Sequence, residues 1–225
     1  MIHFDRVSKR YEGGKQALAE LSFEIPQGQM VFLTGHSGAG KSTLLRLLLM
    51  LETATRGQVV LNGRNLSQTP ARLAPSVRQQ TGMIFQDHKL LPDKTVFDNV
   101  ALPLMIAGLR YQDIGKKVRA ALKKVGLEDR ERSWPLALSG GEQQRVGVAR
   151  AIVGMPPVLL ADEPTGNLDP TLSWELFRLF RELNARGMTI LVASHDLDLV
   201  RRMGQRVLVL SQGRLVDDLT PGTAA

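Results

Sequence analysis

Apolar residues fall into two patterns along the core of this chain. Residues 30–34 (MVFLT) and 157–161 (PVLLA) are short, nearly continuous apolar runs, which predict strands buried on both faces, as in a parallel sheet. A helical pattern follows each run, with helix formers over residues 44–51 and an apolar stripe over residues 170–187. This alternation of buried strand and helix predicts an α/β fold.

A second group of strands is marked by alternating apolar and polar residues. Residues 1–8 and 17–25 alternate on either side of a Gly-Gly turn, which predicts an opening hairpin with its first strand at a sheet edge. Further strands are expected at residues 57–63 before an Asn-Gly turn, at 82–85, at 188–193 and in a hairpin over 206–216. The chain should therefore combine a mixed, mainly parallel sheet with an N-terminal antiparallel β subdomain.

The pattern changes between about residues 87 and 153. Pro92 and Pro103 are expected to interrupt the secondary structure of this segment. Residues 111–125 predict an amphipathic helix whose lysines lie away from its apolar face. We interpret this segment as an α-helical subdomain inserted into a RecA-like core, so that residues 1–225 form one domain. A loose tail is expected from residue 220 onward.

Composition narrows the class of protein only slightly. The chain has no cysteine, which excludes disulfides and thiolate metal sites. No stretch reaches the roughly 18 apolar residues of a membrane span, and the N-terminus does not resemble a signal peptide. Lys and Arg outnumber Asp and Glu by 29 to 22, a balance that suits a polyanionic nucleotide, nucleic acid or an anionic membrane surface.

A glycine-rich loop joins the first buried strand to the helix after it. It matches the pattern G-x-x-x-x-G-K-[ST] and consists of Gly35, His36, Ser37, Gly38, Ala39, Gly40, Lys41, Ser42 and Thr43. Glycines let successive backbone N–H groups point inward, and the helix N-terminus adds its dipole at the same place. Lys41 is suited to the β- and γ-phosphates of a nucleotide, and the Ser42 hydroxyl to Mg²⁺.

Two acidic residues end the second buried strand. Asp162 is placed to hold Mg²⁺ beside the glycine loop. The side chain of Glu163 points to the opposite side of the strand, toward the γ-phosphate, where it is suited to polarise an attacking water. Taken alone, the two residues would be ordinary solvated acids. Together with Lys41 they predict nucleotide hydrolysis.

The segment LSGGEQQR (residues 138–145) opens a helix. Ser139 and Glu142 have the spacing of a capping box, which accounts for part of the pattern. Gly140 and Gly141 lower helix propensity in the first turn and leave bare N–H groups at a positive helix end. The sequence therefore predicts a second anion site here. Asp169 and Pro170 suit the N-cap and first position of a later helix.

The order of these motifs, followed by GNLD (166–169) and SHD (194–196), resembles that of the ATP-binding cassette (ABC) ATPases over essentially the whole chain. The resemblance implies that Gln86 contacts Mg²⁺ or the attacking water in the Q-loop and that His195 is the switch histidine on the γ-phosphate. It also implies that residues 167–169, with Asp169, form the D-loop. Tyr11 would stack on adenine, although a surface tyrosine before a turn is the competing interpretation. His36 faces away from the nucleotide in similar proteins.

The resemblance also implies a homodimer. Two chains would enclose two ATP molecules head to tail, each between the glycine loop of one chain and the Ser139 segment of the other. ATP and Mg²⁺ are the expected cofactors, and no nucleic acid is expected.

Within the family, residues 1–10, 34–40, 82–88, 95–100 and 103–108 closely resemble the ATPases of bacterial cell division. That resemblance implies an integral membrane partner docked near Gln86, at the cytoplasmic face of the inner membrane at the division septum. The implied output is activation of periplasmic peptidoglycan hydrolases. The activators of these hydrolases and the division ring would be indirect partners. Residues 50–56 depart from the family, because they lack its usual glycine and proline.

Three other functions are alternatives to this interpretation, and the residues argue against the third. The chain resembles ATPases of lipoprotein release or of macrolide and peptide efflux in the segment after Gln86. Its basic charge also fits a soluble ABC ATPase acting on nucleic acid, although such proteins usually carry two cassettes or coiled-coil arms. A non-hydrolytic, nucleotide-gated clamp is disfavoured by the presence of Glu163 and His195.

Overall fold

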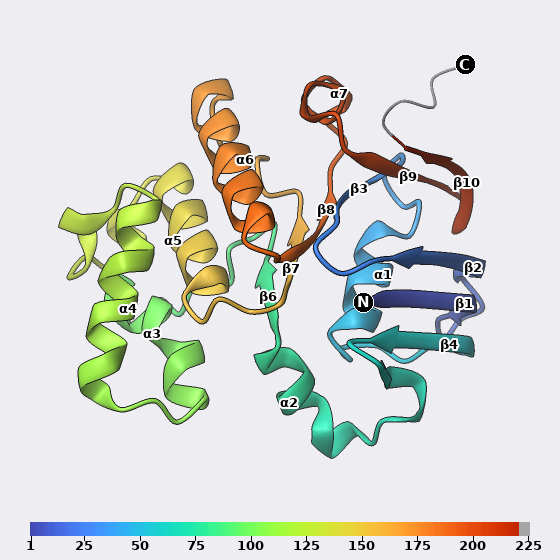
Figure 1. The fold of residues 1–225 in the computed structure, drawn as a ribbon, viewed down its shortest axis with the longest axis horizontal. Coiled ribbons are helices and arrows are strands. Elements are labelled where there is room, and N and C mark those ends of the chain that lie inside the picture. The colour runs from blue at the N-terminus through green and yellow to red at the C-terminus, as the bar shows by residue number, and fades with distance from the viewer. Residues whose placement is uncertain (221–225) are drawn as a thin grey trace.

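The chain folds into two sheets flanked by helices, as seen in a computed structural model that describes residues 1–220 (Figure 1). The tail predicted from residue 220 thus lies almost entirely outside the described residues. The smaller sheet is antiparallel and has the strand order β2-β1-β4-β5. Its strands are β1 (Ile2–Arg10), β2 (Gln16–Ile25), β4 (Arg56–Leu61) and β5 (Arg64–Asn65).

The prediction that the first strand is an edge strand is wrong. β1 lies between β2 and β4 and pairs with both. β4 comes close because it contains Gly57, where an added Cβ would lie 2.3 Å from the carbonyl oxygen of Arg6. Alternation reports only that one face is buried, and an inner strand of a one-sided antiparallel sheet has the same pattern as an edge strand.

The larger sheet has the order β10-β9-β3-β8-β7-β6. All neighbours are parallel except β9 and β10, which pair as an antiparallel hairpin. Its strands are β3 (Met30–Thr34), β6 (Thr81–Ile84), β7 (Val158–Asp162), β8 (Thr189–Ala193), β9 (Arg206–Ser211) and β10 (Arg214–Leu219). The predicted class, an α/β fold with a mixed sheet and an antiparallel subdomain, is confirmed.

Both faces of the larger sheet are covered, which explains why its strands are apolar runs. Phe32 and its same-face neighbours pack into one hydrophobic cluster with Phe177 and Phe180 of α6 (Pro170–Ala185). Val31 and Leu33 point to the opposite face and join a second cluster that includes α1 (Lys41–Leu48) and the inner face of the antiparallel sheet. Successive side chains of one strand thus belong to two cores.

The remaining helices are α2 (Ala74–Gln79), α3 (Val96–Ile106), α4 (Tyr111–Lys124), α5 (Gly140–Ile152) and α7 (Leu197–Met203). Helices α3, α4 and α5 lie together at one side of the molecule (Figure 1). The prediction that Pro103 interrupts the secondary structure is wrong, because Pro103 lies inside α3. Proline has no backbone N–H, so α3 lacks one helical hydrogen bond at this position. Burial of Val100 and Leu104 in the hydrophobic cluster compensates for this loss. None of the helices within residues 1–220 has the length and hydrophobicity to cross a membrane.

The segment that departs from the family begins with an unusual backbone at the end of α1. Met50 has φ 51°, a left-handed conformation that normally favours glycine. Arg78 compensates, because its guanidinium donates to the carbonyl oxygens of Leu49 (2.9 Å) and Met50 (3.0 Å). An arginine from α2 therefore stabilises the turn in place of the missing glycine.

The turn between β9 and β10 supports the glycine-rich loop. Gly213 donates its N–H to the carbonyl of Ala39 (3.0 Å), and its own carbonyl accepts from the N–H of Ala19 (2.9 Å). A Cβ on Gly213 would lie 2.6 Å from the carbonyl oxygen of Ala17. The closing hairpin is thus packed directly between β2 and the loop.

We predict that Gly213→Ala destabilises the protein more than Gly63→Ala. Both residues have nearly the same backbone conformation (φ 75° and 77°), but a Cβ on Gly63 meets nothing within 4 Å. The left-handed conformation should cost each variant about 1–2 kcal/mol, and overpacking should add roughly 1–3 kcal/mol at Gly213 only. Urea denaturation measures both free energies of unfolding, and equal losses would contradict the close packing.

Candidate functional site

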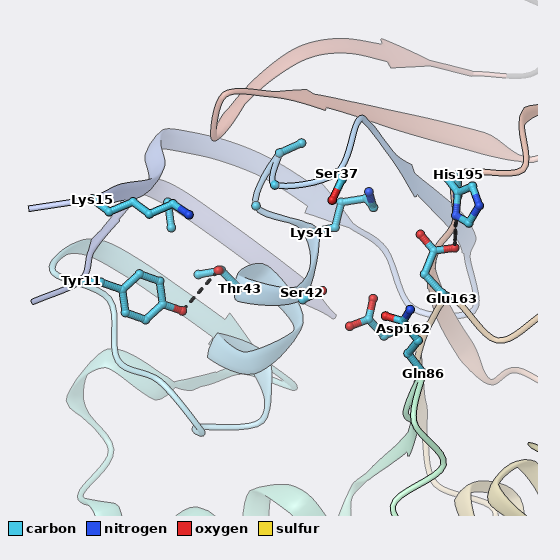
Figure 2. Close-up of a pocket in the computed structure, with 14 residues that line it drawn as sticks. Tyr11, Lys15, Ser37, Lys41, Ser42, Thr43, Gln86, Asp162, Glu163 and His195 are labelled. Atoms are coloured by element: carbon cyan, nitrogen blue, oxygen red, sulfur yellow. Dashed lines mark hydrogen bonds and ion pairs between the residues drawn. The ribbon is translucent and has the colours of Figure 1, made fainter. Parts of the chain in front are cut away.

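The carboxyl ends of β3, β8, β7 and β6 meet at one edge of the larger sheet, where a pocket of about 520 Å³ opens (Figure 2). Ligands of parallel α/β sheets bind in this position, because the loops after the strands diverge there. Fourteen residues line the pocket: Tyr11, Lys15, Ala17, Ser37, Gly38, Ala39, Gly40, Lys41, Ser42, Thr43, Gln86, Asp162, Glu163 and His195. The structure therefore brings most of the candidate residues together.

The glycine-rich loop turns from β3 into α1 as its pattern predicts. Gly40 is the N-cap of α1 with φ 109°, a conformation that a side chain would strain. The ammonium of Lys41 donates to the carbonyls of Gly35 (2.7 Å) and His36 (3.3 Å) and is largely buried. Gly35 and His36 do not line the pocket, and the His36 ring contacts the carbonyl of Ser37 (2.8 Å).

Asp162 ends β7 and projects between Ser42 and Gln86 (Figure 2). Burial raises the pKa of its carboxyl, and the nearby Glu163 raises it further, while a hydrogen bond from Ser42 and the charge of Lys41 oppose the rise. A half-buried carboxylate with a raised pKa is stabilised by a cation. The donor set of Asp162, the Ser42 hydroxyl and the Gln86 amide oxygen fits Mg²⁺, which prefers oxygen ligands.

No group of three or more acidic, histidine or cysteine residues suited to a metal occurs within residues 1–220. At phosphate-transfer sites Mg²⁺ usually keeps water and substrate phosphates as ligands beside one or two carboxylates.

Glu163 and His195 contact each other across the pocket. Glu163 follows β7 and His195 lies two residues beyond β8, and these strands are adjacent and parallel, with Asp162 opposite Ala193. The Nδ1 atom of His195 lies 2.7 Å from Oε2 of Glu163, and the His195 backbone N–H donates to the same oxygen (3.3 Å). Glu163 also has φ 47°, so the backbone directly after β7 is strained. One carboxylate oxygen is thus engaged by the histidine.

Tyr11 closes the far end of the pocket. Its hydroxyl lies 3.3 Å from Oγ1 of Thr43, and the ammonium of Lys9 lies 4.9 Å from the ring centroid. Lys9 also pairs with Glu52 at 2.8 Å. Sequence reasoning missed Lys15 and Ala17, which line the same end of the pocket. Their only sequence signal is their place directly after the turn that follows Tyr11.

The second predicted anion site lies outside this pocket. Ser139 caps α5 and forms the predicted capping box with Glu142, whose own pKa is lowered mainly by the hydrogen bond from the Ser139 backbone. Asp169 caps α6 by accepting from the N–H of Leu172 (2.9 Å). Ser139, Gly140, Gly141, Glu142 and Asp169 are all absent from the pocket lining. The exposed start of α5 is therefore a separate surface.

The fold and the pocket define the class of protein, and comparison with known families agrees. The family model described as ABC transporter matches residues 18–166. The chain therefore belongs to the ABC transporter family.

Its particular relatives are cell-division proteins. The cell division ATP-binding protein FtsE of Escherichia coli K12 is 55% identical over 215 residues, which is 96% of this chain and 97% of the relative. FtsE of Bacillus subtilis is 43% identical over 222 residues, or 99% of this chain and 97% of the relative.

Two solved structures of one ABC cassette share the fold. The dimeric bacterial ABC transporter cassette MJ0796 superposes with a TM-score of 0.94 at 33% identity over 100% of both chains. A dimeric post-hydrolysis state of the same cassette, bound to ADP and phosphate, also has a TM-score of 0.94, at 32% identity over 100% of both chains. This chain is accordingly an ATP-binding ABC ATPase.

We predict that Lys41→Ala lowers ATP affinity by roughly 10- to 100-fold, because it removes charge-assisted hydrogen bonds to the phosphates. Isothermal titration calorimetry measures this change. Lys116→Ala, at an exposed position of α4, is the matched control and should bind ATP with wild-type affinity. Equal affinities of the two variants would remove Lys41 from the nucleotide site.

We predict that Asp162→Asn stabilises the nucleotide-free protein at neutral pH. The folded-state pKa of Asp162 lies above the ordinary 3.8, so the folded chain holds this proton more tightly than the unfolded chain. The ionised carboxylate therefore costs stability that appears as the pH rises above that value. Free energies of unfolding measured from acid to neutral pH should show the gain growing with pH. A gain that does not change with pH would contradict the burial argument.

Proposed function

We propose that this chain is the ATP-hydrolysing subunit of a bacterial cell-division complex and that it drives an integral membrane partner, FtsX. The observation that carries the ATPase chemistry is the single pocket shared by the glycine-rich loop, Asp162, Glu163, His195 and Gln86. The cell-division role is supported by the relatives named cell division ATP-binding protein FtsE, 55% and 43% identical to this chain.

The pocket residues divide the work of hydrolysis. Backbone N–H groups of residues 38–43 and the Lys41 ammonium hold the phosphates, and Ser42, Asp162 and Gln86 hold Mg²⁺, which supplies charge neutralisation at the phosphate oxygens. Glu163 accepts a proton from the attacking water. His195 contacts the Glu163 carboxylate, and in the hydrolysis step it binds the γ-phosphate while Glu163 takes the proton of the attacking water.

The second half of the site comes from a second copy of this chain. Ser139 and Gly140 present an exposed helix N-terminus that suits a phosphate but lies outside the chain's own pocket. A head-to-tail homodimer places that helix over the partner copy's ATP, with Asp169 at the interface, and Tyr11 stacks on adenine. The similar cassette is dimeric in both of its solved structures, which supports a homodimer.

The membrane partner docks beside the Q-loop, on the helical subdomain that we assign to about residues 87–153 within a single domain. Large apolar side chains are exposed at the end of α3 and the start of α4: Met105, Ile106 and Tyr111. The Gln79 side chain donates to the carbonyl of Ile106 (3.3 Å) and joins α2 to the end of α3. This apolar surface suits a helix of FtsX at the cytoplasmic face of the inner membrane.

The output of the complex is mechanical. ATP closes the dimer and hydrolysis opens it, and FtsX passes this cycle to regulators of peptidoglycan hydrolases in the periplasm at the septum, in concert with the division ring. Copurification from the native cell tests the assignment, because an FtsX-like partner supports it. A partner from lipoprotein release or efflux would overturn it, as would tight, salt-dependent DNA binding.

We predict that Glu163→Gln lowers ATP turnover by at least about a hundredfold while ATP still binds, because the amide cannot accept a proton. The variant should accumulate as an ATP-bound dimer, which gel filtration with light scattering detects. Wild-type turnover would remove Glu163 as the base.

We predict that two inactive variants, Lys41→Ala and Ser139→Ala, restore activity when mixed. In a head-to-tail heterodimer, one site carries both defects and the other carries none, so random mixing should give about a quarter of wild-type turnover. Lys41→Ala mixed with Glu163→Gln is the matched control. Both residues belong to the glycine-loop half of a site, so every site in this mixture carries one defect and no intact site forms. Absence of recovery in the first mixture would contradict a shared site.

A further inference from the structure

The imidazole of His88, two residues after Gln86, bridges two other motifs. Its Nδ1 atom contacts the side-chain oxygen of Gln144 in α5, and its Nε2 atom lies 3.3 Å from Nδ2 of Asn167. Asn167 belongs to the loop before α6. One side chain therefore joins the Q-loop, the helix that begins at Ser139 and the D-loop.

The hydrogen bonds around His88 define the proton position on its ring. Gln144 is 2% exposed, and its amide Nε2 donates to the carbonyl of Pro164 (2.9 Å), which can only accept. The Gln144 oxygen therefore faces His88, so Nδ1 must carry the proton and Nε2 must accept from Asn167. The bridge is directional, and it requires a proton on Nδ1.

The backbone at His88 is held just as firmly. His88 and Lys89 have φ 59° and 50°, two successive left-handed residues without a glycine. Arg150 of α5 donates to both of their carbonyl oxygens, at 2.5 Å and 2.7 Å. The Q-loop is thus attached to α5 through Arg150 and through the His88 ring.

Asn167 extends this connection to the predicted dimer surface. An added Cβ on Gly140 would lie 4.0 Å from Cβ of Asn167, and one on Gly141 would lie 3.4 Å from Leu168. The exposed start of α5 therefore rests directly on the D-loop that His88 holds.

We propose that His88 is a positioning residue that makes the Q-loop, the Ser139 helix and the D-loop move as one body. The proposal rests on the proposed function, in which Gln86 serves one ATP and Ser139 serves the other. His88 then aligns the group that a chain lends to its partner copy with the loop that it presents to the membrane partner. Because His88 is not among the residues that line the pocket, its loss should lower kcat and leave ATP binding nearly intact.

Three substitutions separate the two arms of the bridge. Asn places an N–H near the Nδ1 position and keeps only the Gln144 contact, whereas Gln places an acceptor near the Nε2 position and keeps only the Asn167 contact. His88→Ala removes both, and His3→Ala, at an exposed position of β1, is the matched control.

Steady-state kinetics of the full chain with MgATP provide the first test. We expect His88→Ala to lower kcat by about tenfold with less than twofold change in KM, and His88→Asn and His88→Gln to recover only part of kcat. Wild-type kcat in His88→Ala, or full recovery by either single-arm variant, would overturn the proposal. A loss confined to KM would also overturn it, because the ring would then serve binding.

Nitrogen-15 spectroscopy of the imidazoles gives a test that needs no activity. The chain has four histidines, and Nδ1 of His36 and of His195 also faces an oxygen acceptor, so the proposal expects several Nδ1–H signals, of which one disappears in His88→Gln. A His88 ring in the Nε2–H form would overturn the proposal even in an active enzyme. If the wild-type chain hydrolysed no ATP, the proposed function would fail while this spectrum still decided the role of His88.

Discussion

Parallel pairing of β3, β8, β7 and β6 is the constraint on which the rest of the structure depends. Because these strands are buried on both faces, none of their own side chains lines the pocket except Asp162, the last residue of β7. Reactive groups can stand only where the strands end, and parallel pairing brings those ends to one edge of the sheet. The glycine-rich loop, Gln86, Asp162, Glu163 and His195 therefore meet although they are spread over most of the chain.

The same edge of the sheet carries features that cost stability. Burial raises the pKa of Asp162, the backbone of Glu163 is left-handed, and Gly35 packs so closely on Leu210 that a Cβ would lie 2.2 Å from its carbonyl oxygen. Asp162 and Glu163 line the pocket, and Gly35 begins the glycine-rich loop that forms one of its walls. That distribution is typical of a site organised for a ligand, because a bound cation or phosphate offsets the desolvation and the strain.

Much of the fold and the site could be predicted from short stretches of sequence. The apolar runs, the glycine-rich loop, the capping box of Ser139 and Glu142 and the Asp169 cap depend on contacts within a few residues, and all take the expected form. Predictions that depended on distant partners did worse. The place of β1 within its sheet, the helical position of Pro103, the short helix α2 and the pocket residue Lys15 are all decided by packing against remote segments.

The sequence by itself determined which chemistry this protein can perform, because phosphate-binding loops and helix caps are written in neighbouring residues. Only the tertiary structure decided how those parts are distributed. It placed Ser139 away from the chain's own pocket, and it joined His88 to Gln144 and Asn167, which lie 56 and 79 positions further along the chain. Such contacts depend on strand order and helix packing, which arise from the whole hydrophobic core and leave no local pattern.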